Sequence, residues 1–258
     1  MSLVYAPRGL LGVLTPQANT TVEPELQILC PPGVALLTAR MTSAAPDLKS
    51  RLIDYYQCLP RWIGEFANAP LGAIASACTG ASYLIGAAHE DQLFARMAQD
   101  IGRPVTNSAL AVVAAMRALG ARRIALISPY PDWLTSCSQA YWESRDLQVV
   151  EVVQLETSAK AFHPIYGLES HAAENGITQV RSKVDAVLLL GTGTPTLPAL
   201  ARYPQDAQGR PVISCNLALL WHALECLHGQ AQAPRGAALL GLLRDRRWQS
   251  HLSQAISP

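Results

Sequence analysis

The sequence has no clear excess of charge of either sign and no long apolar run. Its 258 residues include 20 lysines and arginines against 19 aspartates and glutamates, and the basic residues are scattered. Proteins that bind nucleic acid or an anionic membrane surface usually carry a basic patch, so we expect neither partner. No apolar run approaches the roughly 18 residues of a membrane-spanning helix, and no basic segment followed by an apolar one opens the chain. We therefore expect a cytoplasmic globular protein.

The sequence also lacks paired cysteines. Six cysteines stand far apart, with no Cys-x-x-Cys motif and no histidines at the spacing of metal ligands: Cys30, Cys58, Cys78, Cys137, Cys215 and Cys226. Such thiols act singly, and most isolated cysteines are small core residues. The spacing therefore predicts no metal site.

Short apolar runs alternate with longer segments of helical period. The runs are residues 9–14, 33–41, 71–78, 103–108, 122–128, 147–155, 184–191 and 210–215. Strands buried on both faces and separated by helices are typical of a parallel sheet in an α/β protein. We expect Pro60 to break or kink the helical region from about 46 to 68, and a loop to precede a last helix after Gly229.

The chain repeats itself at a long period. Thr15-Pro16 after the first run returns as Ser128-Pro129, and "ACTG" around Cys78 returns as "LGTG" around Gly191, both at an offset of 113 residues (128 − 15 and 191 − 78). The segment that begins at 102 returns at 209, an offset of 107. The repeat predicts an internal duplication into two pseudosymmetric parallel-sheet halves with an active site in the cleft between them. We assign residues 1–115 with the C-terminal helix 216–258 to the first half, and 116–215 to the second.

Cys78 stands where the third predicted strand ends and a helix begins. Ligands of α/β proteins bind at the carboxyl ends of strands, and backbone amides at a helix N-terminus favour anions and lower the pKa of a thiol. The alternative is that Cys78 only fills space at a strand end. Its place at a duplicated strand end, before Thr79 and Gly80, favours a functional thiol.

The segments "GVLTPQANTTVEPE", "ACTGAS", "SPYPDW", "GTGTPTL" and "PVISCNLALLWHAL" resemble the aspartate/glutamate racemase superfamily, in its branch of maleate cis-trans isomerases and arylmalonate decarboxylases. The resemblance covers roughly residues 9 to 228. It implies an enzyme without a cofactor, in which cysteines at two equivalent strand ends face each other across a small carboxylate substrate. It also suggests a homodimer.

The resemblance carries roles to individual residues. Cys78 matches the first-half cysteine, Gly191 stands at the second-half position, Asn19 matches an asparagine that holds a substrate carboxylate, and Tyr130 matches a site tyrosine. We expect Cys78 and Tyr130 to be catalytic. We expect the substrate to be bound by Asn19, Thr79, Gly80, Gly191, Thr192 and Gly193.

Each of these residues also has a structural interpretation. Asn19 and the threonines could cap helices, Tyr130 could be a turn aromatic, and the glycines could serve tight turns. For residues near the site we expect core packing for Cys215, a structural role for His222, a covering connection with His163 and Tyr166, and cleft walls that include Ser43, Ala44 and Tyr83.

With glycine at position 191, a two-thiol racemase is disfavoured. The resemblance implies that decarboxylases keep their one cysteine in the second half, whereas here it is in the first. We expect maleate-isomerase-like cis-trans isomerisation, favoured by the "TPQANTTVEPE" and "WHAL" segments. The alternatives are an arylmalonate-type decarboxylase or racemase, or a carboxylate-binding protein without turnover. Gly191→Cys is expected to restore a thiol opposite Cys78.

Overall fold

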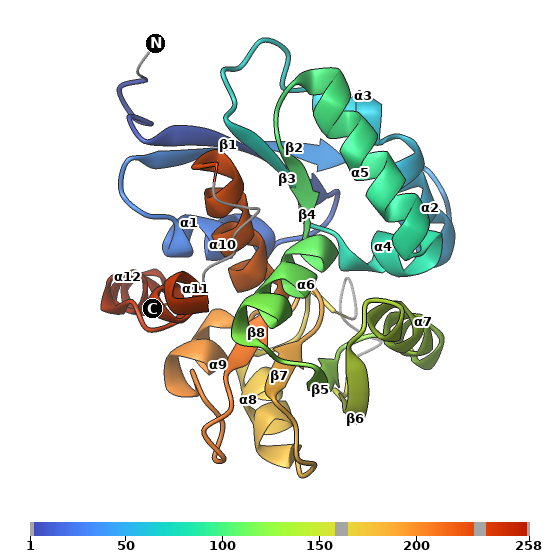
Figure 1. The fold of residues 1–258 in the computed structure, drawn as a ribbon, viewed down its shortest axis with the longest axis vertical. Coiled ribbons are helices and arrows are strands. Elements are labelled where there is room, and N and C mark those ends of the chain that lie inside the picture. Colours follow the sequence, from blue (N-terminus) through green and yellow to red (C-terminus); the bar gives the residue numbers. More distant parts are fainter. Residues whose placement is uncertain (1–2, 158–164, 230–235, 257–258) are drawn as a thin grey trace.

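Two four-stranded parallel sheets form the framework of the protein in the computed structural model, which describes residues 3–157, 165–229 and 236–256. The first sheet has the order β2-β1-β3-β4 and the second the order β6-β5-β7-β8 (Figure 1). The strands are β1 (Gly9–Pro16), β2 (Val34–Met41), β3 (Ala73–Ser76), β4 (Val105–Asn107), β5 (Arg123–Ser128), β6 (Gln148–Gln154), β7 (Ala186–Leu189) and β8 (Val212–Ser214). All eight predicted strands and the predicted fold class are confirmed.

The registers of the two sheets repeat the offsets found in the sequence. In the first sheet Leu11 pairs with Ala73, and in the second Ile124 pairs with Ala186, which is a shift of 113 residues on both strands (124 − 11 and 186 − 73). The last pair of strands shifts differently, because Ile74 pairs with Val105 in one half and Val187 with Val212 in the other. The final strand is therefore offset by 107 residues (212 − 105). Equivalent strand ends consequently occupy equivalent places in the two halves.

Helices connect and cover the strands. They are α1 (Val22–Leu29), α2 (Leu48–Gln57), α3 (Leu59–Gly64), α4 (Thr79–Ile85), α5 (Ala87–Ile101), α6 (Ser108–Leu119), α7 (Asp132–Glu143), α8 (Ser170–Gln179), α9 (Leu197–Arg202), α10 (Cys215–Leu227), α11 (Gly236–Leu243) and α12 (Arg246–Ile256). The predicted break near Pro60 is confirmed, because α2 ends before Cys58 and Pro60 lies in the first turn of α3, where proline is tolerated. Two helices, not one, follow the segment 230–235, which lies outside the described residues.

Helices α6 and α10 fill the space between the sheets. Each follows the last strand of its half, and the caps are equivalent: Asn107 accepts the N–H of Leu110, and Ser214 accepts the N–H of Leu217. Helix α10 leaves the second sheet and packs on β1, β3 and β4 of the first, as the predicted division of the chain requires. The predicted boundary at residue 115 falls inside α6, and the division itself stays a prediction.

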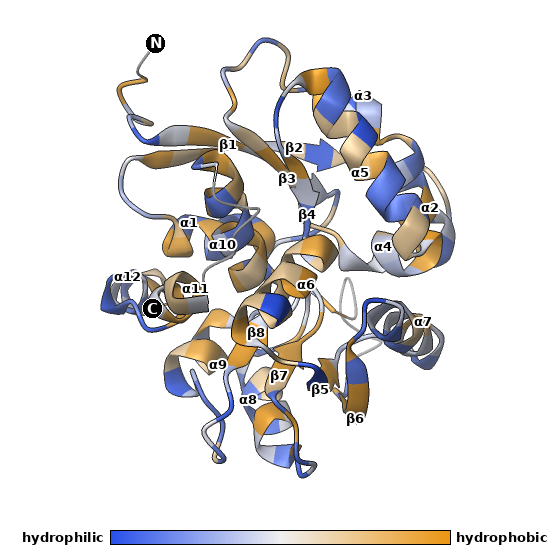
Figure 2. Ribbon diagram, viewed as in Figure 1, coloured by the Kyte–Doolittle hydropathy of each residue, from blue (hydrophilic) through white to orange (hydrophobic). Residues whose placement is uncertain are grey.

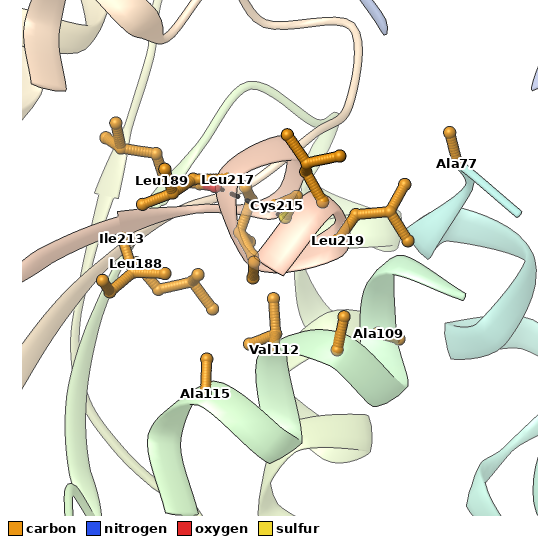
Figure 3. Packing of buried hydrophobic residues seen from close by; sticks show 14 of the residues in the cluster. Ala77, Ala109, Val112, Ala115, Leu188, Leu189, Ile213, Cys215, Leu217 and Leu219 are labelled. Atoms are coloured by element: carbon orange, nitrogen blue, oxygen red, sulfur yellow. Dashed lines mark hydrogen bonds between the residues drawn. The ribbon is translucent and has the colours of Figure 1, made fainter. Parts of the chain in front are cut away.

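The core is continuous across both sheets and the helices between them. Figure 3 shows Val112 and Ala115 of α6 in one buried cluster with Leu188 and Ile213 of the second sheet. Hydrophobic residues gather on the strands and on α6 and α10, while α5 carries hydrophilic residues on its outer side (Figure 2). Because the two halves share one core, the ends of their central strands are held in fixed relation. Over the described ranges, no helix has the length and apolar character needed to cross a membrane.

Candidate active site

A pocket of about 200 Å³ lies where the carboxyl ends of β1, β3, β5 and β7 meet. Its described lining residues are Pro16, Gln17, Ala18, Leu48, Arg51, Leu52, Tyr55, Cys78, Thr79, Gly80, Tyr130, Leu134, Ile165, Tyr166, Gly191, Thr192 and Gly193. Seven of the eight predicted site residues therefore line the pocket. The exception is Asn19. The volume is below that of sites for drug-sized ligands, so the pocket fits a small molecule.

Cys78 lies between β3 and the first turn of α4, with 3% of its surface exposed. Burial raises the pKa of its thiol to about 11, although the backbone N–H groups of Ala81 and Gly80 act in the opposite direction. The helix amides therefore lower this pKa, as expected, but burial raises it by more, and the net shift is upward. Desolvation of a thiolate outweighs the two donors, and Cys78 is a neutral thiol at neutral pH.

Tyr130 lies across the pocket from the first half and is joined to it. Its hydroxyl is 2.7 Å from Oγ1 of Thr79, a hydrogen bond that connects the loop after β5 to the first turn of α4. Burial raises the pKa of Tyr130 well above its ordinary value. The Tyr83 ring packs behind it at 6.0 Å between centroids, so Tyr83 supports Tyr130 and does not form the pocket wall that we predicted for it. The Tyr130 hydroxyl is therefore neutral, and it can donate to a ligand when the Thr79 hydroxyl is the donor in the bond between them.

Asn19 is used inside the protein. Its Oδ1 accepts the N–H groups of Thr21 and Val22 at the start of α1, and its Nδ2 donates to Thr192 Oγ1 at 3.3 Å. The Thr192 hydroxyl donates in turn to the carbonyl of Ala77 at 2.9 Å. Asn19 therefore joins the two halves just behind the pocket, and its predicted contact with a carboxylate stays a prediction.

Gly191 has a backbone conformation that disfavours a cysteine. Its φ of +87° lies in the left-handed region, and a Cβ there would stand 2.9 Å from both Pro129 Cγ and Thr194 Oγ1. The equivalent Cys78 has an extended φ of −145°. The Cβ position is also 3.6 Å from the Tyr130 hydroxyl. The internal repeat matched Cys78 with Gly191, and the registers of the two sheets agree. A cysteine at position 191 would nevertheless have a strained backbone and close contacts, so Gly191→Cys would not reproduce the geometry of Cys78.

Position 193 has no room for a side chain, because the Tyr166 ring lies against it. A Cβ at this residue would lie 2.2 Å from Cε1 of Tyr166, so the tyrosine ring packs directly on the glycine. Tyr166 thereby covers the second-half side of the pocket, as predicted. The accompanying prediction for His163 falls outside the described residues.

Cys215 and His222 are core residues, as expected. The Cys215 thiol donates to the carbonyl of Leu189 at 3.4 Å within the apolar cluster of Figure 3 and does not line the pocket. His222 Nδ1 is 3.0 Å from Thr106 Oγ1, and burial lowers the pKa of its imidazole to about 4. Ser43 and Ala44 line a separate hollow and not the pocket, contrary to the predicted cleft wall.

A carboxylate behind the pocket holds the loop after β7 in place. Glu25 of α1 accepts the N–H groups of Thr196 and Leu197 at 2.5 and 3.0 Å, and Nδ2 of Asn216 at 2.7 Å. Asn216 also donates to the carbonyl of Thr192 at 3.0 Å. The Gly191–Gly193 loop is thus fixed from the first half.

Sequence reasoning missed the wall that α2 provides. Leu48, Arg51, Leu52 and Tyr55 are spaced three and four residues apart, and all of them line the pocket. Their spacing was a usable signal, because it places an arginine within the apolar face of an amphipathic helix. Across the described ranges, no group of three or more His, Cys, Asp or Glu side chains is arranged to hold a metal ion.

Comparisons with known proteins agree with the resemblance seen in the sequence. The family model described as arylmalonate decarboxylase matches residues 11–240. The arylmalonate decarboxylase of Bordetella bronchiseptica is 30% identical over 242 residues, which cover 85% of this chain and 96% of that protein. The maleate isomerase of Geobacillus stearothermophilus is 28% identical over 254 residues, which cover 89% and 96%.

Solved structures of similar proteins have the same fold. The maleate isomerase of Pseudomonas putida S16 superimposes with a TM-score of 0.75 at 25% identity, covering 85% of this chain and 93% of that one. A mutant of the Nocardia farcinica maleate cis-trans isomerase, with a covalently bound succinylcysteine intermediate, gives a TM-score of 0.74 at 25% identity and the same coverage.

Proposed function

The chain belongs to the arylmalonate decarboxylase family, and from this membership together with the pocket we propose that it is a cysteine enzyme acting on a small carboxylate. The favoured reaction is cis-trans isomerisation of a maleate-like substrate. The observation that supports it is the position of Cys78, which among the described lining residues is the only cysteine, at the carboxyl end of β3 in a pocket of small volume.

One thiol is sufficient for this reaction. The sulfur of Cys78 adds to one carbon of the double bond, and the thiol proton passes to the other carbon, so that S–H adds across C=C. The former double bond is then a single bond and can rotate. Loss of the same two groups from the rotated form restores the thiol and gives the trans isomer, with atoms and electrons balanced. The covalent succinylcysteine in the Nocardia relative is the intermediate that such an addition produces.

The pocket supplies what the addition requires. When the sulfur adds to one carbon of the double bond, charge develops on the carboxylate attached to the other carbon. Donors fixed in advance stabilise that charge, and we assign this role to the buried Tyr130 hydroxyl. Because Tyr130 and Cys78 are contributed by different halves, they approach a substrate from different sides. Tyr130 therefore orients the substrate carboxylate while Cys78 forms and breaks the covalent bond.

Decarboxylation is the second candidate, and the protonated state of Cys78 favours it. Loss of carbon dioxide from a malonate leaves an electron pair on the α-carbon as an enediolate, and a neutral thiol can donate its proton there. Water then returns a proton to the thiolate. The 30% identical decarboxylase relative supports this alternative.

From the composition we propose a cytoplasmic protein, and from the family resemblance a homodimer. From the internal repeat we propose that the chain divides near residue 115, with the segment from 216 onward belonging to the first half.

The test is conversion of maleate to fumarate, followed by proton NMR. We expect fumarate from the wild-type protein and a loss of more than about a thousandfold in Cys78→Ala, because a missing nucleophile costs many factors of ten. Cys137→Ala is the matched control, since Cys137 is a half-buried thiol of α7 outside the pocket, and its rate should stay within twofold.

Three results would change the proposal. Carbon dioxide release from an arylmalonate without isomerisation would favour the decarboxylase. Saturable maleate binding without turnover of either compound would indicate a binding protein. Retention of about a tenth or more of the activity in Cys78→Ala would remove Cys78 from the mechanism.

A further inference from the structure

Arg51 is the one charged residue among the described residues that line the pocket. It stands on the inward face of α2, with Leu48 and Leu52 on either side and Tyr55 one turn further along. Lysine and arginine usually point away from the core on an amphipathic helix. An arginine among inward-facing apolar residues therefore needs an explanation.

The guanidinium of Arg51 has no partner within the part of the chain that the structure describes: no hydrogen bond or salt bridge of its side chain occurs there. The other arginine near the pocket is engaged. Arg40 pairs with Glu23 and donates to the carbonyl of Asn19 at 2.8 Å. Arg51 is half-buried, so its charge is only partly hydrated and an anion beside it would be held more firmly than at an exposed site.

Arg51 belongs to the same space as the thiol. Its neighbour Leu52 packs on Gly80, two residues after Cys78, because a Cβ at Gly80 would lie 3.0 Å from Leu52 Cδ1. The pKa values of the Tyr55 and Tyr166 hydroxyls are affected by both Arg51 and Cys78. Burial is the main cause that raises the pKa of each tyrosine, the Cys78 charge adds to it and the Arg51 charge opposes it. The guanidinium and the thiol thus act across a single small cavity.

We propose that Arg51 is the specificity-determining residue of this pocket and binds a second carboxylate of a substrate whose reacting carbon lies at Cys78. This rests on the proposed function, which places a maleate-like dicarboxylate in the pocket, and it adds which residue holds the second carboxylate. The first carboxylate is oriented by Tyr130 and the second by Arg51.

The chemistry of the side chain supports this assignment. The planar guanidinium offers paired N–H groups that match the two oxygens of a carboxylate, a geometry that a lysine cannot reproduce. A substrate with an uncharged group at that end would leave the guanidinium unpaired, so the pocket would discriminate by charge and not only by shape. Arg51 forms no bond to the reacting atoms and is a recognition residue.

The experiment compares two unreactive ligands of the same shape, succinate and succinamate, in which one carboxylate is replaced by an amide. Dissociation constants are measured by calorimetry for the wild-type protein, Arg51→Gln, Arg51→Lys and Lys49→Gln. Lys49→Gln is the matched control, because Lys49 is an exposed cation of the same helix that does not line the pocket.

We expect Arg51→Gln to weaken succinate binding about ten- to hundredfold and to leave succinamate binding within twofold, as expected for loss of a charge-assisted pair. Arg51→Lys should recover part of the loss, and Lys49→Gln should match the wild type. Thermal melting confirms that each variant is folded, and the lysine variant keeps the comparison possible if the glutamine variant is not.

An unchanged ratio of succinate to succinamate affinity in Arg51→Gln, with both ligands still bound, would overturn this inference and leave the proposed function standing. An equal loss in Lys49→Gln would also overturn it, because the effect would then come from the general field of α2. Failure of the wild-type protein to bind either ligand or to convert maleate would overturn the proposed function and the inference with it.

Discussion

Cys78 has a pKa that is raised by burial and only partly lowered by the amides of Gly80 and Ala81. The sequence reveals a thiol at a strand end and a helix that begins beside it. It does not reveal that only 3% of the surface of Cys78 is exposed, or that α4, which begins after it, packs on both α2 and α7. The balance between desolvation and hydrogen bonding is therefore a tertiary property.

Alkylation of Cys78 by iodoacetamide should depend on pH accordingly. The pKa is raised from 9.0 to about 11, so the thiolate fraction at pH 8 is about a hundredfold lower than for an unperturbed thiol, and the rate should rise about tenfold per pH unit up to about pH 11. Mass mapping of the Cys78 peptide measures the rate, and the urea-unfolded chain provides the control. A midpoint at or below pH 8 in the folded protein would show that the amides outweigh burial.

Gly191 shows a different limit of sequence reasoning. The duplication identifies it as the counterpart of Cys78, and the registers of the two sheets agree. The identity of the residue alone does not give its φ of +87°, which arises from the turn between β7 and the following loop. Equivalent positions in a duplicated fold have therefore diverged in backbone conformation as well as in chemistry.

At the scale of elements, strands were easier to predict than helix ends. Each strand is a short apolar run, and all but the edge strands β2 and β6 are mostly buried on both faces, a pattern that local sequence carries by itself. The amphipathic stretch from 81 to 102 looks like one helix, but the chain divides it at Gly86, whose φ is +77°, into α4 and α5. The short helix α4 begins at Thr79, whose hydroxyl is hydrogen-bonded to Tyr130.

The contact of α1 with the loop after β7 is the element-scale feature that most directly supports the pocket. Glu25→Ala removes the acceptor for the backbone N–H groups of Thr196 and Leu197 and for Asn216. Because these donors would stay buried without a partner, we expect the free energy of unfolding to fall by roughly 3 kcal/mol, and turnover to fall with it as the Gly191–Gly193 loop loosens.

Chemical denaturation of Glu25→Ala, together with maleate turnover, measures both effects. Gln27→Ala is the control, since Gln27 is an exposed residue of the same helix, and it should change the free energy of unfolding by less than about 0.5 kcal/mol. Equal stability of the two variants would show that Glu25 does not hold the loop.

At the scale of the molecule, the duplication predicted the two parallel sheets and the cleft between them, but not the order of their strands. The duplication did not predict that Arg51 lines the pocket. Arg51 lies on α2, which follows β2, and the connection that follows β6 in the second half has no matching sequence with which α2 could be compared. The sequence also did not reveal that the Asn19 amide accepts N–H groups at the start of α1 and donates to Thr192, and the contact of Asn19 with a carboxylate stays a prediction. A site between two halves depends on contacts between residues that are far apart in the sequence, and local sequence patterns do not predict these contacts.

Among the described residues that line the pocket, Cys78 of the first half is the only cysteine. The most direct test is to quench the reaction with maleate in acid at early times and to map, by mass spectrometry, which cysteine carries an added substrate molecule. We predict an adduct on Cys78 that appears during turnover, is absent in Cys78→Ala and is not found on Cys215. Turnover without any adduct, or an adduct on Cys215, would contradict the account of a single first-half thiol that forms the covalent intermediate.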